Sequence, residues 1–398
     1  MQHRIVVLGA GYAGASAAGR LAKRLRREDV RITLVNAEPD FTERVRMHQL
    51  ATGQDLARRP LAKMFAGTGV DVRVARVTAV DADRKAVTVA TAGGPDELFY
   101  DTLVYALGSH WNDQGTPGAA QHAHEIAGRA GALRLRERLA ALGAGQPVVV
   151  VGGGLTGLEA VTEIAEARPD LDVTLVARGA LGDWLSDKGR RHLKAVLDGF
   201  GITVHQHTAV SVVGADHVVT ADGTALPSAA TVWTTGFSVH PIAQATTLEV
   251  TGTGRIVVDS TMRSVSHPDV YAVGDAAWAM GPGDKPLRMS CASGTPSAWQ
   301  AADAIAARLA GRKHKDVPLR YFNQCVSLGR REGLIQFVTA DDRAVPRALT
   351  GRLAALYKEL VCKGAAWGVA HPTLGLPTRR RPVTEQQAPA SATARAAT

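Results

Sequence analysis

The chain has 398 residues, 45% of them hydrophobic and 21% charged, and its formal net charge is +9 with histidine neutral. This composition is typical of a globular protein and excludes an intrinsically disordered chain. The apolar runs stop well short of the roughly 20 residues that span a bilayer, which argues against a membrane-spanning segment. A chain of this length has room for two or three domains, each with its own core.

The charge and the cysteines narrow the functional classes. The positive charge is not interleaved with aromatic residues in any known docking motif, so we interpret it as a solvated basic surface and expect no nucleic-acid partner. Cys291, Cys325 and Cys362 are far apart and odd in number, which predicts neither a disulfide framework nor a metal site. The first strand begins at Ile5 and leaves no room for a signal peptide, so we expect a cytoplasmic enzyme.

The first predicted unit is a strand, a glycine-rich turn and a helix. Ile5–Leu8 is a continuous apolar strand of the kind buried in a parallel sheet, and Val30–Val35 is the next strand. Between them Gly9, Gly11 and Gly14 have the G-x-G-x-x-G spacing. The first glycine allows a tight turn, the second lets backbone approach a pyrophosphate, and the third lets the helix pack against the strand. The unit predicts a dinucleotide site at a helix N-terminus.

A second copy of this unit lies in the middle of the chain. Gly152, Gly154 and Gly157 repeat the spacing after an apolar strand, and Val173–Val176 is the following strand. Gly152 follows Gly9 by 143 residues, which indicates one such unit in each of two domains and not a short repeat. Two dinucleotide sites in one chain predict a flavin in one site and a nicotinamide in the other, with hydride transfer from one cofactor to its neighbour.

Five motifs in chain order carry a resemblance to a known family. They are GAGYAG at 9–14, YDTLVYALGS at 100–109, GGGLTGLE at 152–159, TVWTTGFSVHP at 231–241 and HPDVYAVGDAA at 267–277. In this order they resemble the two-dinucleotide-binding-domain flavoproteins of the pyridine nucleotide-disulfide oxidoreductase-like family. Within that family the chain most resembles type II NADH dehydrogenases and apoptosis-inducing-factor-like NAD(P)H:quinone reductases, as HQLATG at 48–53 also indicates.

The resemblance implies an α/β fold with two Rossmann-like dinucleotide-binding domains, the glutathione-reductase-like fold, and a small C-terminal domain. The implied division is a discontinuous FAD-binding domain at 1–112 and 252–318, an NAD(P)H-binding domain at 113–251, a C-terminal interface domain at 319–377 and a disordered basic tail at 378–398.

The resemblance also implies the cofactor-binding residues. Those expected at FAD are Gly9, Gly11, Tyr12, Ala13, Gly14, Asn36, Glu38, Arg44, Gly108, Gly274, Asp275, Thr295 and Pro296. Those expected at NADH or NADPH are Gly152, Gly154, Thr156, Gly157, Arg178 and Gly236. A plain helix cap is the alternative for Asp275. Thr295-Pro296 is expected to begin the helix whose N-terminus faces the flavin.

Both units depart from the usual end of the second strand, where an acidic residue binds a ribose hydroxyl. The first unit has Asn36 there and Glu38 two residues on, and either side chain is a candidate. The second has Ala177 followed by Arg178. A missing carboxylate and an added guanidinium favour NADPH over NADH, whereas an exposed loop arginine is the alternative.

The sequence beside the expected flavin limits the acceptor. Disulfide reductases of this fold carry a cysteine pair there, but residues 40–53 contain no cysteine. The electrons are therefore expected to go to an outside acceptor, and the resemblance favours a quinone. Ala298-Trp299-Gln300 matches the quinone-site stretch of relatives only in part, and we interpret Cys291 as a small packed residue.

Three residues are candidates for catalysis. Glu159 matches a glutamate that quinone-reducing relatives place near the flavin, where it would orient the nicotinamide or carry a proton. A surface pair with an arginine is its alternative, and Glu163, one turn on, is interpreted as structural. His48 is a candidate proton relay and Arg46 a candidate for holding an anionic ring or acceptor. The alternative is a pair of Arg46 with Glu43 that braces the helix.

A helix near 350–363 carries an apolar stripe with basic residues around it. The stripe consists of Leu353, Leu356, Tyr357, Leu360 and Val361. We expect it to pack on its own domain or on a second subunit of a homodimer. Peripheral contact with the inner face of the membrane is the alternative.

The sequence therefore predicts an FAD-dependent oxidoreductase that takes hydride from NADH or NADPH and passes electrons to a quinone-like acceptor. Because fold alone does not settle function, two alternatives stay open. One is a biosynthetic flavoenzyme that oxidises a dedicated metabolite. The other is a flavoprotein that binds a protein partner under the control of NAD(P)H.

Overall fold

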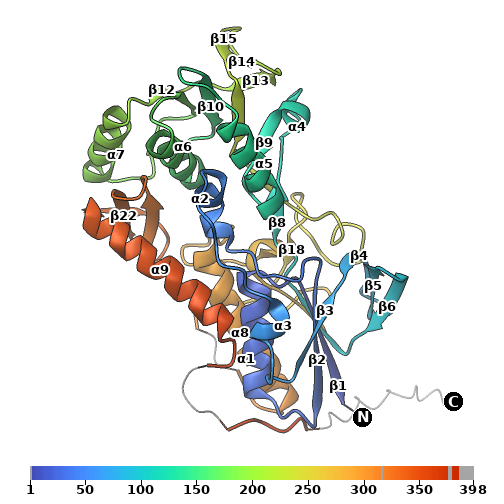
Figure 1. Cartoon of the computed structure of the whole chain (residues 1–398). Helices are drawn as coiled ribbons and strands as arrows, with labels where there is room; N and C mark the ends of the chain where they lie inside the picture. The colour runs from blue at the N-terminus through green and yellow to red at the C-terminus, as the bar shows by residue number, and fades with distance from the viewer. Residues whose placement is uncertain (1, 315–316, 375–378, 385–398) are drawn as a thin grey trace, which may run out of the picture.

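The computed structural model describes residues 2–314, 317–374 and 379–384. Two five-stranded parallel sheets organise the chain (Figure 1). The first has the order β19-β7-β1-β2-β3. Its strands are β1 (His3–Leu8), β2 (Val30–Asn36), β3 (Val70–Val74), β7 (Thr102–Tyr105) and β19 (Val270–Ala272). The strands predicted at Ile5–Leu8 and Val30–Val35 are confirmed.

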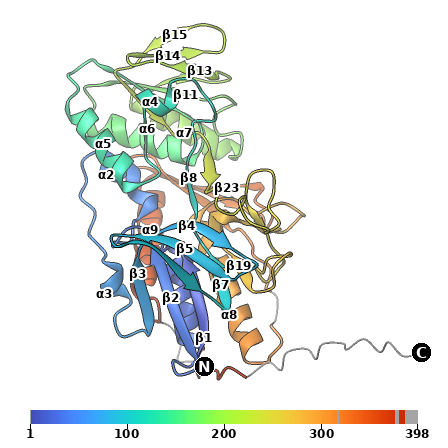
Figure 2. The same cartoon turned by 90° about the vertical axis from the view of Figure 1, so that its right-hand side faces the viewer.

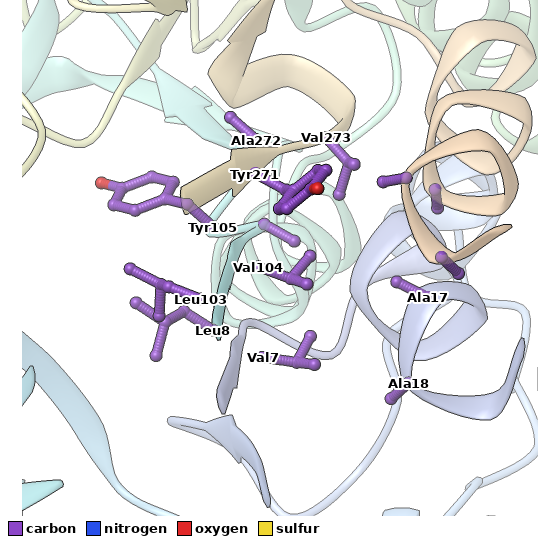
Figure 3. Close-up of a cluster of buried hydrophobic side chains, with 14 of the residues drawn as sticks. Val7, Leu8, Ala17, Ala18, Leu103, Val104, Tyr105, Tyr271, Ala272 and Val273 are labelled. Carbon is purple, nitrogen blue, oxygen red and sulfur yellow. The ribbon is translucent and has the colours of Figure 1, made fainter. Parts of the chain in front are cut away.

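Helices α1 (Tyr12–Arg24) and α8 (Cys291–Leu309) pack together against this first sheet. Figure 3 shows Ala17 and Ala18 of α1 beside the buried side chains of Val7, Val104 and Tyr271. Alanine lets the helix approach the sheet closely, because it adds little volume between the two backbones. The small residues after the first glycine turn thus build the core on which that turn rests.

The second sheet has the order β12-β11-β10-β16-β9. Its strands are β9 (Ala123–Glu125), β10 (Pro147–Val151), β11 (Asp172–Val176), β12 (Thr203–His205) and β16 (Ala230–Trp233). Helices α5 (Arg129–Ala140), α6 (Leu155–Ala167) and α7 (Asp187–Gly199) accompany it. The predicted strand Val173–Val176 is confirmed as part of β11, and the expected α/β fold of two parallel sheets is confirmed with it.

The chain passes between the two sheets on β8 (Ser109–Trp111) and β17 (Phe237–Val239), which pair antiparallel. Smaller elements complete the part of the chain before the C-terminal segment (Figure 2). They are η1 (Arg44–Arg46), α2 (Met47–Ala51), α3 (Leu61–Met64), β4 (Arg76–Asp81), β5 (Ala86–Thr91), β6 (Gly94–Phe99), α4 (Ala119–His122), β13 (Val210–Val213), β14 (His217–Thr220), β15 (Ala225–Pro227), β18 (Ile256–Val257), η2 (Gly274–Ala276) and β20 (Ala277–Trp278). The domain boundaries at 112, 251 and 318 remain our proposal.

The C-terminal segment forms the antiparallel strands β21 (Asn323–Ser327), β22 (Gly333–Val338) and β23 (Ala344–Thr350), followed by helix α9 (Arg352–Ala370). Helix α9 starts against these strands and continues to α1, so it spans the gap between the two larger parts (Figure 1). None of the helices in the described parts of the chain is long and apolar enough to cross a membrane.

The apolar stripe of α9 is exposed, which corrects the expectation that it packs on its own domain. Leu353, Leu356 and Leu360 are 67%, 57% and 60% exposed. The buried face is the one with the smaller residues Ala354, Cys362, Ala366 and Val369. The small side chains on the buried face let α9 pack closely against α1 and β22. The leucines lie on the opposite face of the helix and are therefore exposed.

Part of the predicted disordered tail has a defined place. Arg381 forms a parallel bridge with Leu25 at the end of α1, and the backbone N–H of Thr384 donates to the carbonyl of Leu309. These contacts contradict disorder for residues 379–384, because their backbone groups are paired with the first domain. Residues 378 and 385–398 of that prediction lie outside the described residues.

Candidate active site

One continuous cavity of about 2220 Å³ lies where the two sheets, α8 and α9 meet. Both glycine turns contribute to its wall, through Gly11 and Gly154. The carboxyl ends of parallel strands are where α/β proteins bind ligands, because the following turns and helix N-termini converge there. Most of the residues predicted for the cofactors line this cavity: Gly11, Tyr12, Ala13, Asn36, Glu38, Arg44, Gly108, Gly274, Asp275, Thr295, Pro296, Gly154, Thr156 and Gly236.

The first glycine turn has the geometry that its spacing predicts. Gly9 has a φ of +89°, and a Cβ atom there would lie 2.4 Å from the carbonyl oxygen of Ala106. A Cβ on Gly14 would lie 1.8 Å from the carbonyl oxygen of Gly9. Gly11 faces open space in the cavity, so a phosphate group can approach its backbone. Gly9 and Gly14 are therefore required for the conformation of the turn, and Gly11 exposes the backbone of the turn to the cavity.

Asn36 and Glu38, the two candidates at the end of the second strand, have different surroundings. The Oδ1 atom of Asn36 accepts a hydrogen bond from Ala10 N–H at 2.9 Å, and its Nδ2 donates to the carbonyl of Glu38 at 2.8 Å. Asn36 thus braces the glycine turn from below. The Glu38 side chain is exposed and borders the cavity, so Glu38 is the better placed of the two to bind a ribose.

Arg44, Asp275 and Ser109 form a polar group at the junction between the domains. Ser109 Oγ donates to Asp275 Oδ2 at 2.6 Å, and Arg44 Nη1 lies 3.7 Å from the same oxygen. Arg44 also stacks on the ring of Phe237, with its guanidinium carbon 4.9 Å from the ring centre. A partly buried arginine beside one carboxylate suits the charge of a pyrophosphate. Ser109 was missed, although it ends the YDTLVYALGS motif.

The start of α8 differs from the prediction. The helix begins at Cys291, with Ser290 as its N-cap residue, so Thr295-Pro296 lies inside it. Proline at the sixth helical position removes the hydrogen bond that a main-chain N–H there would donate to the carbonyl of residue 292. Both residues line the cavity. Cys291 is exposed to the cavity and is not packed, because it stands at the open first turn of the helix.

Tyr12 shows that the first site has an unused polar group. Its ring packs edge-on against Phe41, with ring centres 5.0 Å apart. Its buried hydroxyl has no hydrogen-bond partner among the described residues and borders the cavity. Such an oxygen is costly unless a ligand or water pairs with it. Together with the open backbone at Gly11 and the exposed Glu38, this hydroxyl suits a dinucleotide ligand.

The second glycine turn repeats the first. Gly152 has a φ of +125°, and a Cβ on Gly157 would lie 1.8 Å from the carbonyl oxygen of Gly152. Gly154 is open toward the cavity, as Gly11 is. At the end of the next strand Ala177 is buried, whereas Arg178 is exposed and lies outside the cavity wall. The structure therefore leaves Arg178 at the outer edge of the site.

Glu159 on helix α6 is the centre of a polar group at the cavity. Glu159 Oε1 lies 3.0 Å from Lys358 Nζ, and its Oε2 lies 3.9 Å from His48 Nδ1. Ser327 donates to Glu159 Oε1 from both its backbone N–H, at 3.1 Å, and its hydroxyl, at 3.2 Å. Glu159, Lys358 and His48 all border the cavity. A buried carboxylate is thus held by a cation, a histidine and a serine.

The charges in this group stabilise each other. Burial raises the pKa of Glu159, but Lys358 and His48 outweigh it, so the pKa is lower than usual. Burial lowers the pKa of Lys358, but the Glu159 carboxylate outweighs that effect and raises it. Burial lowers the pKa of His48 to about 4. At neutral pH the group is therefore an ion pair with a neutral imidazole beside it.

Lys358 and Ser327 were missed in the sequence, and Arg46 has a different place from the one predicted. Arg46 is buried and pairs with Glu43 at 3.3 Å and with Glu359 at 3.0 Å. It does not line the cavity. The pair with Glu43 is the one that the alternative expected, whereas the pair with Glu359, which ties Arg46 to α9, was not expected. Gln300 is buried and donates to the carbonyl of Ser260, so it does not face the cavity either.

No group of three or more His, Cys, Asp or Glu side chains in the described ranges is placed to hold a metal ion. Cys291, Cys325 and Cys362 are all free thiols, although they border the same cavity. The cavity thus offers backbone, carboxylate, ammonium and imidazole groups to its ligands.

Comparison with known proteins agrees with this arrangement. A family model described as pyridine nucleotide-disulphide oxidoreductase matches residues 3–306. An NADH dehydrogenase-like protein of Mycobacterium tuberculosis is 30% identical over 318 residues, which cover 74% of this chain and 77% of that protein. A type II NADH:quinone oxidoreductase of Staphylococcus epidermidis is 26% identical and covers 90% of this chain and 94% of that protein.

The fold is shared with solved structures as well. The sulfide:quinone oxidoreductase of Aquifex aeolicus superposes with a TM-score of 0.79 at 19% sequence identity, covering 93% of this chain and 92% of that one. At this identity the likeness concerns the fold.

Proposed function

The chain belongs to the pyridine nucleotide-disulphide oxidoreductase family and is an NAD(P)H-dependent flavoprotein oxidoreductase, and we propose that its flavin is FAD and its acceptor a quinone. The observation that carries the proposal is the Glu159–Lys358–His48 group, which borders the cavity shared by the two glycine turns. A quinone must take up protons as well as electrons, and this group can supply and direct a proton.

The first glycine turn and its neighbours are proposed to hold FAD. Gly11 would receive the pyrophosphate on open backbone, Arg44 would pair with it, and Glu38 would bind the ribose. The N-terminal turn of α8 would place its positive dipole end near the ring system. When bound, FAD accepts a hydride and passes on two electrons.

Glu159 is proposed to orient the nicotinamide and to carry a proton at its Oε2 only during its transfer to the acceptor. Lys358 keeps this carboxylate ionised and fixes its position through the bond to Oε1. The neutral His48 offers a nitrogen on the other side. Closing the site with α9 would exclude water from the group and so strengthen these interactions.

The second turn is proposed to bind NADPH in preference to NADH. Ala177 stands where a carboxylate would repel the 2′-phosphate, and the exposed Arg178 follows it. An arginine that is free to move can pair with a phosphate through two hydrogen bonds.

Two observations support a quinone as the electron acceptor: the lack of a cysteine pair in residues 40–53 and the names of the relatives. The first-domain stretch 40–53 has no cysteine, so no local disulfide lies there to take the electrons. The S. epidermidis relative, which spans nearly the whole chain, is named as a quinone reductase. Trp299 and Trp367 are exposed and line the cavity, and aromatic side chains suit an aromatic ring.

The exposed face of α9 is proposed to contact a membrane surface. Leu353, Leu356 and Leu360 are exposed, and Arg352 and Lys363 lie on the same helix. Apolar side chains between cations are typical of helices that lie on anionic bilayers. A homodimer through the same face is the competing arrangement. Sedimentation with anionic liposomes, against size-exclusion chromatography without lipid, separates the two.

The test of the function is steady-state turnover with a quinone series, for the unaltered protein and for Glu159→Gln. We expect quinone-dependent oxidation of NAD(P)H that falls by roughly 10²-fold in the variant. Turnover with one particular metabolite and none with quinones would favour a biosynthetic flavoenzyme. Absence of turnover, together with a change of oligomeric state when NAD(P)H is added, would favour the partner-binding alternative.

A further inference from the structure

Three glutamates lie on one stripe of α6. Glu159, Glu163 and Glu166 follow one another at spacings of four and three residues, which places them on the same face of the helix. The helix packs against α2 and β21. Glu159 borders the reaction cavity. Glu166 lies at the other end of the stripe, where its carboxylate accepts a hydrogen bond from the backbone N–H of Arg330.

Glu163, in the middle of the stripe, is only 2% exposed. Its Oε1 accepts a hydrogen bond from Gln54 Nε2 at 2.5 Å. Its Oε2 is buried and has no hydrogen-bond partner among the described residues. A buried carboxylate oxygen without a partner is costly when charged and much less so when it carries a proton. Its position therefore favours a carboxyl group that binds and releases a proton, and not a purely structural one.

The outer end of the stripe reaches solvent through Arg330. Arg330 Nη1 lies 3.7 Å from Glu163 Oε1, and the arginine side chain is 42% exposed. Arg330 also lines a separate surface hollow of about 580 Å³, together with Arg331, Arg352 and Glu359. Water in this hollow is thus one side chain away from Glu163.

The inner end reaches the reaction cavity through Glu159. Its carboxylate contacts Lys358 at 3.0 Å and His48 at 3.9 Å, and all three residues border the cavity. Glu163 lies one helical turn from Glu159. The stripe therefore runs from Glu159 at the reaction cavity to Glu163, which lies beside Arg330 at the surface hollow.

The charges around Glu163 come from three elements. Burial raises the pKa of Glu163 to about 7; Arg330 from the β21–β22 turn lowers it, Glu166 raises it, the Gln54 hydrogen bond lowers it and Glu159 raises it. His48, on α2, is neutral at this pH because burial lowers its pKa. A group that titrates near neutral pH is suited to pass protons in both directions.

We propose that Glu163 takes up a proton from water beside Arg330 and passes it along α6 to Glu159 at the reaction cavity. The inference rests on the proposed reduction of a quinone. That reaction consumes one quinone, one NAD(P)H and one proton and yields one quinol and one NAD(P)⁺. The hydride carries two electrons and one proton, so the second proton must come from water. It ends on an acceptor oxygen, and Glu163 is protonated again from the surface hollow.

The first test replaces the carboxyl group with an amide of the same shape. Glu163→Gln keeps an oxygen for Gln54 but has no proton to transfer. Quinone turnover is expected to fall roughly 10-fold to 100-fold, and the fall in turnover above about pH 7 is expected to disappear from the pH profile. The rate at which NAD(P)H reduces the flavin, and turnover with ferricyanide, which takes electrons without protons, are expected to stay within about twofold.

A second variant moves the titration without removing the group. Arg330 lowers the pKa of Glu163, so Arg330→Gln is expected to raise that pKa and shift the alkaline fall of turnover to higher pH. Infrared difference spectroscopy provides a readout besides activity. A protonated carboxyl band should titrate near pH 7 in the unaltered protein, be absent in Glu163→Gln and titrate at higher pH in Arg330→Gln.

Glu137→Gln is the matched control, because it removes an exposed carboxylate on the neighbouring helix α5. It should change none of these readouts. An unchanged pH profile in Glu163→Gln, or an equal loss with ferricyanide, would overturn the route while the proposed function stands. If the unaltered protein reduces its flavin with NAD(P)H but reduces no quinone, the proposed function fails first and the proton balance fails with it.

Discussion

The two glycine turns of this protein have nearly the same backbone and different surroundings. In each, the first glycine has positive φ, and a side chain on the third would lie 1.8 Å from the carbonyl oxygen of the first. The helices that follow differ at matching positions, 143 residues apart. Ser16, Arg20 and Lys23 of α1 correspond to Glu159, Glu163 and Glu166 of α6. The repeated glycine spacing sets the backbone that contacts a dinucleotide. The side chains on the following helix determine which chemistry takes place beside it.

The largest expected effect comes from replacing the third glycine of each turn, and it should differ between the two turns. Gly14→Val and Gly157→Val each force a side chain into a backbone carbonyl. Gly14→Val is expected to abolish flavin retention, because the first turn rests on the main core. Gly157→Val is expected to leave the protein yellow but to slow its reduction by NAD(P)H more than roughly 100-fold. Flavin absorbance and anaerobic reduction measure both. A colourless Gly157→Val protein would show that the two sites do not fold independently.

The next effect tests the charge that only the second helix carries. Lys358→Met leaves the Glu159 carboxylate buried without its cation, which should reduce the free energy of unfolding by about 3–5 kcal/mol. The double variant Glu159→Gln/Lys358→Met should recover most of this loss. Ser16→Ala, the matching position of the first helix, should cost less than about 1 kcal/mol. Denaturant unfolding gives all three values, and equal losses at Ser16 and Lys358 would contradict the comparison.

A smaller effect concerns the pH dependence of the same region. Burial lowers the pKa of His48 from 6.5 to about 4, so the unfolded chain binds a proton that the folded chain rejects between these values. Stability should therefore be full above pH 6.5 and fall by on the order of 3 kcal/mol as the pH drops toward 4. His48→Asn should flatten this window. An equally steep fall in that variant would assign the acid sensitivity to other groups.

The smallest effect concerns the ends of the second strands, where the two turns differ most at the surface. Arg178→Ala should raise the KM for NADPH roughly tenfold and leave the KM for NADH unchanged. Glu38→Gln, in the first unit, should weaken flavin binding without changing the ratio of the two KM values. Steady-state kinetics with both nucleotides give the ratio. A ratio that moves with Glu38 and not with Arg178 would reverse the assignment of the two sites.

Local signals predicted the strands and turns well. Apolar runs before G-x-G-x-x-G placed β1, β2 and β11 to within a few residues, because burial in a parallel sheet requires such runs. The N-terminus of α8 was displaced by four residues, because Pro296 is tolerated inside the helix instead of starting it. The stripe of α9 was expected to pack on its own domain or on a second subunit, and the first of these is wrong. Periodicity shows that a helix has an apolar face but not what lies opposite that face.

The remote members of the site could not be predicted from spacing. Lys358 and Ser327 come from the C-terminal segment, about 170 to 200 residues after Glu159, and no local pattern connects them. Arg46 was predicted as a candidate to hold an anionic ring or acceptor, but its guanidinium pairs with Glu359 on α9. The three cysteines likewise gather at one cavity through the fold and not through their order. Burial and ion pairing at long range decide such contacts.

We expect the nicotinamide bound at the second glycine turn to transfer a hydride to the flavin bound at the first, because both sites open into one cavity. Anaerobic rapid mixing of the yellow protein with NADPH, and then with NADH, tests it most directly. One equivalent of nicotinamide is expected to bleach the flavin absorbance completely, faster with NADPH than with NADH. A flavin that neither nicotinamide bleaches would contradict it, because the second glycine turn would then have no hydride donor to bind.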